Sequence, residues 1–205
     1  MVNGNKPETP TKRMGYLYKI VLIGDGAVGK TALRNRFMGK GFDPEYLMTI
    51  GADFSLYTIR LETVPESPTV TFQIWDLAGT PHHGTILSAY YKGAYGALIV
   101  YDVTRRDTYE NVRKWADDFI KNNGRGELPF CVIANKTDLR SETPVSIQKE
   151  EGLDLTEQLT EKLVKPSICI DYIETSALTG QNVNLAFHSL ARNIWVWLEE
   201  MRKKR

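Results

Sequence analysis

One short segment, Gly24 to Thr31 with the sequence GDGAVGKT, constrains the fold of this chain more than any other. The run YKIVLI at residues 18–23 reads as a buried strand, and the residues after the segment read as a helix. In the pattern GxxxxGK(S/T), glycines let successive backbone amides turn toward an anion, and the following helix adds the positive end of its dipole. We therefore predict a phosphate-binding loop, in which Lys30 reaches the terminal phosphates and the Thr31 hydroxyl holds Mg²⁺.

The simpler alternative for this segment is a glycine-rich turn that carries a surface lysine. The strand before it and the helix after it favour the phosphate loop, because that motif requires both. The predicted phosphate-binding residues of the loop are consecutive: Gly24, Asp25, Gly26, Ala27, Val28, Gly29, Lys30 and Thr31.

Length and composition limit the broad class of protein. A chain of 205 residues fits one domain with a sizeable core, and a formal net charge of +1 gives no general attraction to nucleic acid or to anionic membranes. Cys131 and Cys169 each lie in an apolar run, which predicts reduced, buried thiols and a cytoplasmic location. No apolar run approaches the ~18 residues of a membrane span, so we expect a soluble protein.

Periodicity predicts strands that alternate with helices. Residues 1–16 are polar, without a period, and are expected to form a flexible tail. Apolar or β-branched runs predict further strands at 54–61, 70–75, 97–101, 130–134 and 168–174. The strands at 54–61 and 70–75 are expected to form a hairpin, with 54–61 at the edge of the sheet. Helical spacing or composition predicts helices at 31–38, at 109–120, within 146–163 and from Val183 onward. This alternation indicates a doubly wound α/β sheet, whose ligands bind at the carboxyl ends of the strands.

Polar residues follow several of these strands. After the strand at 70–75 come Asp76, positioned to hold Mg²⁺ through water, and Gly79, whose amide can face a terminal phosphate. The run NKTD at residues 135–138 follows the strand at 130–134, and the run TSAL at residues 175–178 follows the last strand.

Asp138 predicts the choice of base. A carboxylate accepts two hydrogen bonds at once from the N1–H and the exocyclic amine of guanine, whereas adenine presents an acceptor at N1. Because an unpaired buried carboxylate is costly, such a site rejects the wrong base by factors on the order of 10⁴. The prediction is therefore guanine. The alternative, a polar loop in which Asp138 caps a helix, does not explain why the run follows a strand in a chain with a phosphate loop.

With these motifs in place, the sequence resembles the small GTPases of the Ras superfamily, and most closely the Rab family. The matching blocks occur in the family's order: GDGAVGKT, TIGADF at 49–54, WDLAG at 75–79, YYKGA at 90–94, YDVT at 101–104, NKTD and ETSA at 174–177. The resemblance implies a P-loop NTPase fold, the small G domain, with a six-stranded, mostly parallel sheet and helices on both faces. It places this domain at residues 17–201, between the tail at 1–16 and a short basic tail at 202–205.

The same resemblance implies roles for individual residues. It implies binding of GTP or GDP with Mg²⁺, which Thr31, Thr49 and Asp76 would hold. Thr49 would also sense the γ-phosphate, and Tyr46 would close over the phosphates. The residues implied to contact the guanine are Phe42, Asn135, Lys136, Asp138, Ser176, Ala177 and Leu178.

The implied partners are effector, exchange-factor and GTPase-activating proteins. Two segments would change between the GTP and GDP states and bind them, Phe42–Phe54 and Gly79–Gly93. Thr49 and the Gly79 amide are satisfied by the γ-phosphate and Mg²⁺ only while that phosphate is present, so its loss frees both segments together.

Several positions depart from the family pattern. The catalytic residues implied by the resemblance are Lys30 and Thr80. Thr80 stands where the family usually has the glutamine that orients the attacking water, so we predict weak intrinsic hydrolysis. Gly26 leaves space beside the γ-phosphate for an arginine supplied by another protein, and no arginine of this chain is identifiable for that role. Leu178 replaces a usual lysine, which predicts a modest loss of guanine affinity.

The carboxyl-terminal residues predict location. The last nine residues, WLEEMRKKR, hold no cysteine to accept a prenyl group, so we expect no lipid anchor; the alternative is that the carboxyl-terminal tail is truncated. The basic residues add at most a weak electrostatic contact with a membrane, consistent with a cytoplasmic protein that is peripheral to membranes at most. Residues 139–165 are longer than in typical family members, and a solvated insertion is the default interpretation.

Three functions fit these observations. The favoured one is a GTP-hydrolysing switch, slow by itself. The second is a module that holds GTP and recruits effectors with negligible turnover, because Thr80 replaces the glutamine. The third, an ATP-using or phosphotransferase P-loop enzyme, is disfavoured because Asp138 selects guanine and no acceptor site can be identified.

Overall fold

A single mixed sheet organises the protein. The computed structural model describes residues 15–42, 49–79, 84–143, 146–165 and 168–204. The six strands lie in the order β2-β3-β1-β4-β5-β6, and all neighbours are parallel except the edge strand β2, which is antiparallel to β3. Their bounds are β1 Gly15–Ile23, β2 Ala52–Arg60, β3 Thr69–Leu77, β4 Gly96–Asp102, β5 Phe130–Asn135 and β6 Ile170–Glu174. The predicted six-stranded α/β fold is confirmed.

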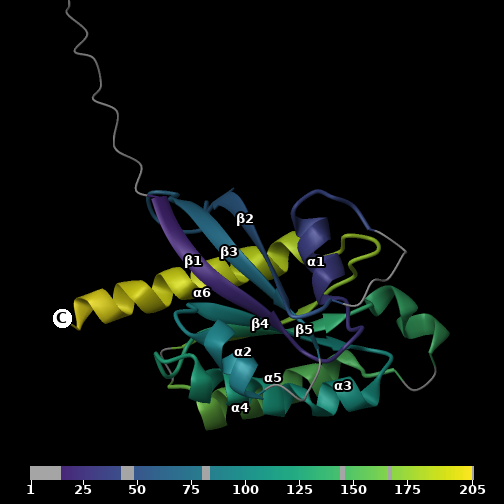
Figure 1. The fold of residues 1–205 in the computed structure, drawn as a ribbon. Helices are drawn as coiled ribbons and strands as arrows, with labels where there is room; N and C mark the ends of the chain where they lie inside the picture. The colour runs from purple at the N-terminus through teal and green to yellow at the C-terminus, as the bar shows by residue number, and fades with distance from the viewer. Residues whose placement is uncertain (1–14, 43–48, 80–83, 144–145, 166–167, 205) are drawn as a thin grey trace, which may run out of the picture.

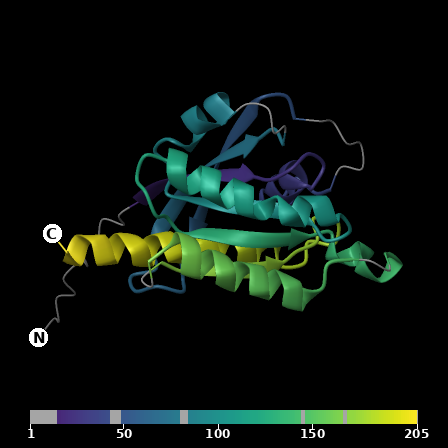
Figure 2. The same ribbon diagram turned by 90° about the horizontal axis from the view of Figure 1, so that it is seen from below.

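Helices cover both faces of the sheet, as Figures 1 and 2 show. One face carries α1 and the long α6, and the other carries α2, α4 and α5. The helices are α1 Lys30–Phe37, α2 Gly84–Tyr91, α3 Arg106–Glu110, α4 Val112–Asn122, α5 Lys149–Leu163 and α6 Val183–Lys203, with a 3-10 helix η1 at Thr137–Glu142. Within the described ranges, no helix combines the length and apolar character needed to span a bilayer.

The structure differs from the sequence-based expectations at four places. The helix expected at 109–120 is divided at Asn111 into α3 and α4. Helix α2 was not predicted, because its sequence GTILSAYY begins with glycine and contains β-branched and aromatic residues of modest helix propensity. Strand β1 begins at Gly15, inside the stretch expected to be a tail, and α6 continues to Lys203.

The apolar core lies in two layers, one on each face of the sheet. Between the sheet and α1 and α6, the rings of Phe37 and Phe187 stack in parallel with centroids 3.9 Å apart. Cys131 is buried in this layer, and burial raises the pKa of its thiol, so it stays protonated. Cys169 is exposed and lies one residue before β6, so the expectation of a second buried thiol was wrong.

Helix α5 packs against β6 through a close contact between Gly152 and Tyr172. A Cβ atom placed on Gly152 would lie 2.3 Å from a ring carbon of Tyr172. The phenol oxygen of Tyr172 donates to the carboxylate of Glu174, which also accepts a hydrogen bond from Arg140 of η1. The segment 139–165 is thus tied to the sheet beside the end of β6.

This contact predicts that Gly152→Ala destabilises the fold. The added methyl group must displace the Tyr172 ring, and overpacking of this kind costs about 2 kcal/mol of unfolding free energy. The cost should exceed the ~1 kcal/mol that alanine contributes to a helix over glycine. Urea unfolding measures it against Glu157→Ala, a change at an exposed position of the same helix. An unfolding free energy equal to or above that of the wild type would contradict the prediction.

Candidate functional site

The carboxyl ends of the five parallel strands meet at one edge of the sheet, beside the start of α1 (Figure 1). The loop 24–29 follows β1, and Asp76 lies near the end of β3. Asp102 and Asn135 end the neighbouring strands β4 and β5 and are paired in register. Ligand sites of open α/β sheets occupy this position.

The loop between β1 and α1 passes so close to its neighbours that side chains are excluded at two positions. A Cβ atom on Gly24, at φ +137°, would lie 2.1 Å from the carbonyl oxygen of Val100. A Cβ atom on Gly29, at φ +97°, would lie 2.4 Å from the side-chain nitrogen of Asn135. Both positions therefore require a residue that accepts a positive φ and has no side chain, which only glycine provides.

Lys30 begins α1 and points back into the loop. Its ammonium group donates to the carbonyl oxygens of Gly24 and Asp25, both at 2.7 Å, and the residue is 6% exposed. Burial lowers the pKa of Lys30 to about 8, against the opposing effect of the carboxylates of Asp76 and Asp25. A phosphate at the loop would supply the counter-charge that a buried ammonium lacks.

Three oxygen-bearing side chains from separate elements meet next to Lys30. The Thr31 hydroxyl donates to a carboxylate oxygen of Asp76 at 2.6 Å, and the hydroxyl oxygens of Thr31 and Thr49 lie 2.9 Å apart. The other carboxylate oxygen of Asp76 is buried without a hydrogen-bond partner among the described residues. Hydroxyl and carboxylate oxygens are the ligands that Mg²⁺ prefers, so this set fits the ion.

The charge of Asp76 depends on its neighbours. Burial raises the pKa of Asp76, while the hydrogen bond from Thr31 and the positive charge of Arg34 lower it. Arg34 lies 3.6 Å from Asp76 and 2.6 Å from Asp53 of β2. A divalent cation would favour the ionised carboxylate further.

Gly79 lies directly against the loop. A Cβ atom on Gly79 would lie 2.3 Å from both the carbonyl carbon of Asp25 and the amide nitrogen of Gly26. No side chain fits there, which explains why residue 79, three positions after Asp76, is a glycine. Tyr46 and Thr80, two further candidate residues, lie outside the described residues.

At the other end of the site, Asn135 joins the phosphate loop to the segment after β6. Its side-chain nitrogen donates to the carbonyl oxygen of Val28 at 2.8 Å. Its side-chain oxygen accepts from the Thr175 hydroxyl at 3.1 Å and from the amide of Ala177 at 3.3 Å. Lys136 follows in a left-handed conformation, φ +66°, with its ammonium 2.7 Å from the carboxylate of Asp102.

The remaining residues predicted to contact the guanine differ in their exposure. One carboxylate oxygen of Asp138 is buried and has no hydrogen-bond partner among the described residues. Ser176 and Ala177 are buried, so their backbone is held firmly by the fold. Leu178 and Phe42 are 50% and 40% exposed.

The structure also reveals contacts that sequence reasoning missed. The carboxylate of Asp25 accepts from the Asn111 amide at 2.7 Å and from the Trp115 indole nitrogen at 2.8 Å. The Arg105 guanidinium donates to the carbonyl oxygen of Gly26 at 2.9 Å. Trp115 lies in the helix expected at 109–120, and its indole nitrogen was the available signal for its contact with Asp25. The sequence carries no signal for the contacts of Asn111 and Arg105.

Comparison with known proteins agrees with this geometry. The model of the Ras family matches residues 19–196. The chain belongs to the Ras family. It is 39% identical to Ras-related protein Rab-11A of Dictyostelium discoideum over 88% of this chain and 77% of the relative. It is 41% identical to Ras-related protein RABA1b of Arabidopsis thaliana, over 88% and 76%, and 39% identical to GTP-binding protein ypt2 of Schizosaccharomyces pombe, over 90% and 84%.

Membership of the Ras family, with relatives named Rab among its matches, makes this chain a Rab-like small GTPase. The predictions of GTP and GDP binding, of GTPase activity in general, and of effector, exchange-factor and activating partners are confirmed at this level. The residues that carry these roles remain predictions, which the contacts above make testable.

Asn135→Ala is expected to release GDP faster, by roughly 100-fold. The substitution leaves the Val28 carbonyl, the Thr175 hydroxyl and the Ala177 amide without this partner, and each such loss costs about 1–3 kcal/mol. Dissociation of a fluorescent GDP analogue measures the effect. The control is Asn122→Ala, whose amide donates to Asp118 within α4. Release at the wild-type rate would show that the Asn135 contacts do not support the site.

Proposed function

We propose that this Rab-like GTPase is a switch that binds GTP or GDP with Mg²⁺ through the residues described above and hydrolyses GTP slowly. The observation that carries the proposal is the unpartnered buried oxygen of Asp138, on a loop that Asn135 ties to the phosphate loop. A buried acceptor of this kind is costly unless a ligand pairs with it, and guanine offers two adjacent donors.

At the phosphate end, the protein neutralises and orients the nucleotide. Lys30 and the amides of residues 24–31 hold the phosphate chain, and because Lys30 and Asp76 are buried, solvent screens their charges little. Mg²⁺, when bound by Thr31, Thr49 and Asp76, supplies positive charge to the phosphates. Tyr46 closes over them in this proposal, and Phe42, Lys136, Ser176, Ala177 and Leu178 surround the base.

The reaction is slow in this proposal because the water-orienting group is weak. Thr80 follows Gly79 directly, and its short hydroxyl cannot make the pair of contacts that a glutamine amide makes. Activating proteins are therefore expected to supply most of the rate of the GTP-to-GDP step.

The segments 42–54 and 79–93 are proposed to present the nucleotide state to partners. An aromatic cluster, Phe54, Trp75 and Tyr90, links them: Trp75 lies 5.5 Å from each of the other two rings. In the first of these segments, the side chain of Ile50 is 93% exposed. A partner that covers this cluster contacts both segments and thereby detects whether they are ordered.

Location remains a proposal. We place this protein in the cytoplasm, peripheral to membranes and acting in membrane trafficking or signalling. Arg202 and Lys203 lie in the last turn of α6 and contribute to a weak electrostatic contact with an anionic membrane.

Thr80 favours a second candidate function, a GTP-bound binding module with negligible turnover. The nucleotide that co-purifies with the protein separates the two. Mostly GDP supports the switch, and mostly GTP supports the module.

Base selection is tested at Asp138. Calorimetry should show GDP binding with ADP weaker by about 10³-fold or more. Asp138→Asn should weaken GDP on the order of 100-fold and favour xanthosine diphosphate, because the new amide donates to the 2-oxo group of xanthine. Asp154→Asn, on the exposed side of α5, is the control. Equal binding of ADP and GDP by the wild type would end the proposal.

Hydrolysis is tested at Thr80. Thr80→Gln should raise the single-turnover rate of GTP cleavage at least about tenfold, because the amide can orient the attacking water. Lys121→Gln, at an exposed site on α4, controls for the added amide and should leave the rate unchanged. A Thr80→Gln rate equal to that of the wild type would show that residue 80 does not limit hydrolysis.

A further inference from the structure

Three side chains from one short segment hold the phosphate loop from its outer side. Arg105 donates to the carbonyl oxygen of Gly26 at 2.9 Å, and Asn111 and Trp115 donate to the Asp25 carboxylate. We call these three residues the outer brace. Asn111 and Trp115 bind a side chain, whereas Arg105 binds the backbone of the loop itself.

Hydrogen bonds within the segment hold the backbone beneath Arg105. The Asp102 carboxylate accepts from the amide and the hydroxyl of Thr104, at 2.9 and 2.7 Å, and the Arg105 amide donates to the Asp102 carbonyl. A second guanidinium nitrogen of Arg105 lies 2.8 Å from the carboxylate of Asp107. Both ends of the side chain are therefore held, and the guanidinium is preset against Gly26.

The bond to Gly26 constrains the next amide. A trans peptide is planar, so the carbonyl of Gly26 and the N–H of Ala27 point in opposite directions. With the carbonyl bound by Arg105, the Ala27 N–H points away from the guanidinium, and we expect it to face the phosphate-binding side of the loop. Ala27 also has φ +63°, a conformation that costs a non-glycine residue about 1 kcal/mol or more and persists only where its surroundings impose it.

We propose that Arg105 is a positioning residue for GTP hydrolysis, which fixes and polarises the Gly26–Ala27 peptide. A cation on the carbonyl strengthens the opposite N–H as a donor, and donors preset toward developing charge on the phosphates lower the barrier. The chain thus carries a positive charge of its own beside Gly26. This inference rests on the proposed function of the loop as a GTP site.

The other two residues of the outer brace separate a role of Arg105 in hydrolysis from a role in holding the fold. Asn111 and Trp115 keep their bonds to Asp25 when Arg105 is removed, so the loop retains its outer support. Removing Arg105 should therefore change the polarity and orientation of one peptide while nucleotide binding is largely kept.

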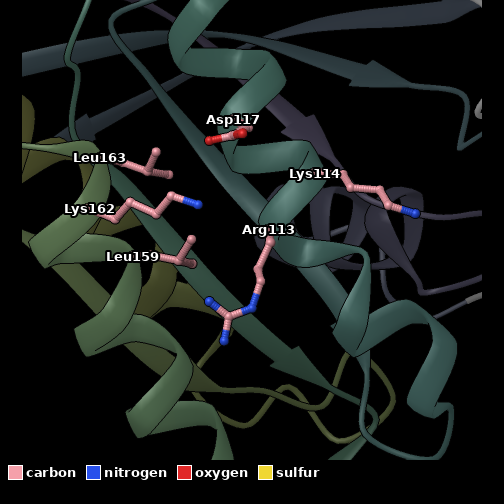
Figure 3. Close-up of a pocket in the computed structure, with 6 residues that line it drawn as sticks. All are labelled: Arg113, Lys114, Asp117, Leu159, Lys162 and Leu163. Atoms are coloured by element: carbon pink, nitrogen blue, oxygen red, sulfur yellow. The ribbon is translucent and has the colours of Figure 1, made fainter.

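The test compares Arg105→Ala and Arg105→Lys with a matched control. The control is Arg113→Ala: Figure 3 shows Arg113 extending from α4 into the pocket between α4 and α5, and its guanidinium donates to Gln158 at 2.6 Å. Arg105→Ala should slow single-turnover GTP cleavage roughly tenfold, less than the loss of a whole preset donor. GDP release should change less than about threefold, Arg105→Lys should recover part of the rate, and the control should match the wild type.

Phosphorus NMR of the protein with a bound, non-hydrolysable GTP analogue provides a second readout. The resonances of the terminal phosphates should shift in Arg105→Ala, shift less in Arg105→Lys and stay in place in Arg113→Ala. Unchanged cleavage and unchanged resonances in Arg105→Ala would overturn the inference, as would equal weakening of GDP and GTP binding with a normal rate of cleavage. If the wild type binds GTP but does not cleave it, the proposed hydrolysis fails by itself, and the resonances alone decide the role of Arg105.

Discussion

The side chain of Asn135 is the contact on which the arrangement of the site depends. It ends β5, and its two polar atoms join the phosphate loop at Val28 to the segment after β6 at Thr175 and Ala177. Because the amide is buried, none of these partners can exchange it for water without cost. The two ends of a nucleotide would thus be held at one fixed separation by a single side chain.

Two buried carboxylate oxygens, one on Asp76 and one on Asp138, lack partners among the described residues. Each lies where the proposed ligands, Mg²⁺ or its water and the guanine base, would supply the missing partner. Each unpaired group lowers the unfolding free energy by about 1–3 kcal/mol. A ligand that pairs with them would raise the unfolding free energy again, so ligand binding and the stability of the fold would be coupled.

Much of the fold follows from local patterns. Strands β4 and β5 are nearly continuous apolar runs, the pattern typical of a strand that is buried on both faces of a sheet. Helix α6 repeats apolar residues at the helical period. Helix α2 and the division between α3 and α4 were not predictable in this way. The weak propensity of GTILSAYY is overridden by packing, and Asn111 turns toward Asp25 of a loop 86 residues away in the sequence.

The sequence by itself determined which groups are available for chemistry: the glycine spacing of the loop, Lys30 and Thr31 at its end, and a carboxylate near or after the end of each of two strands. These signals are local, because each motif is a few consecutive residues with a fixed backbone demand. Only the tertiary structure decided which groups meet, such as Arg105 with Gly26, Asn135 with Val28, and Thr31 with Thr49 and Asp76. Such pairs form where parallel strands bring distant residues to one edge of the sheet, and no local pattern encodes a partner that far along the chain.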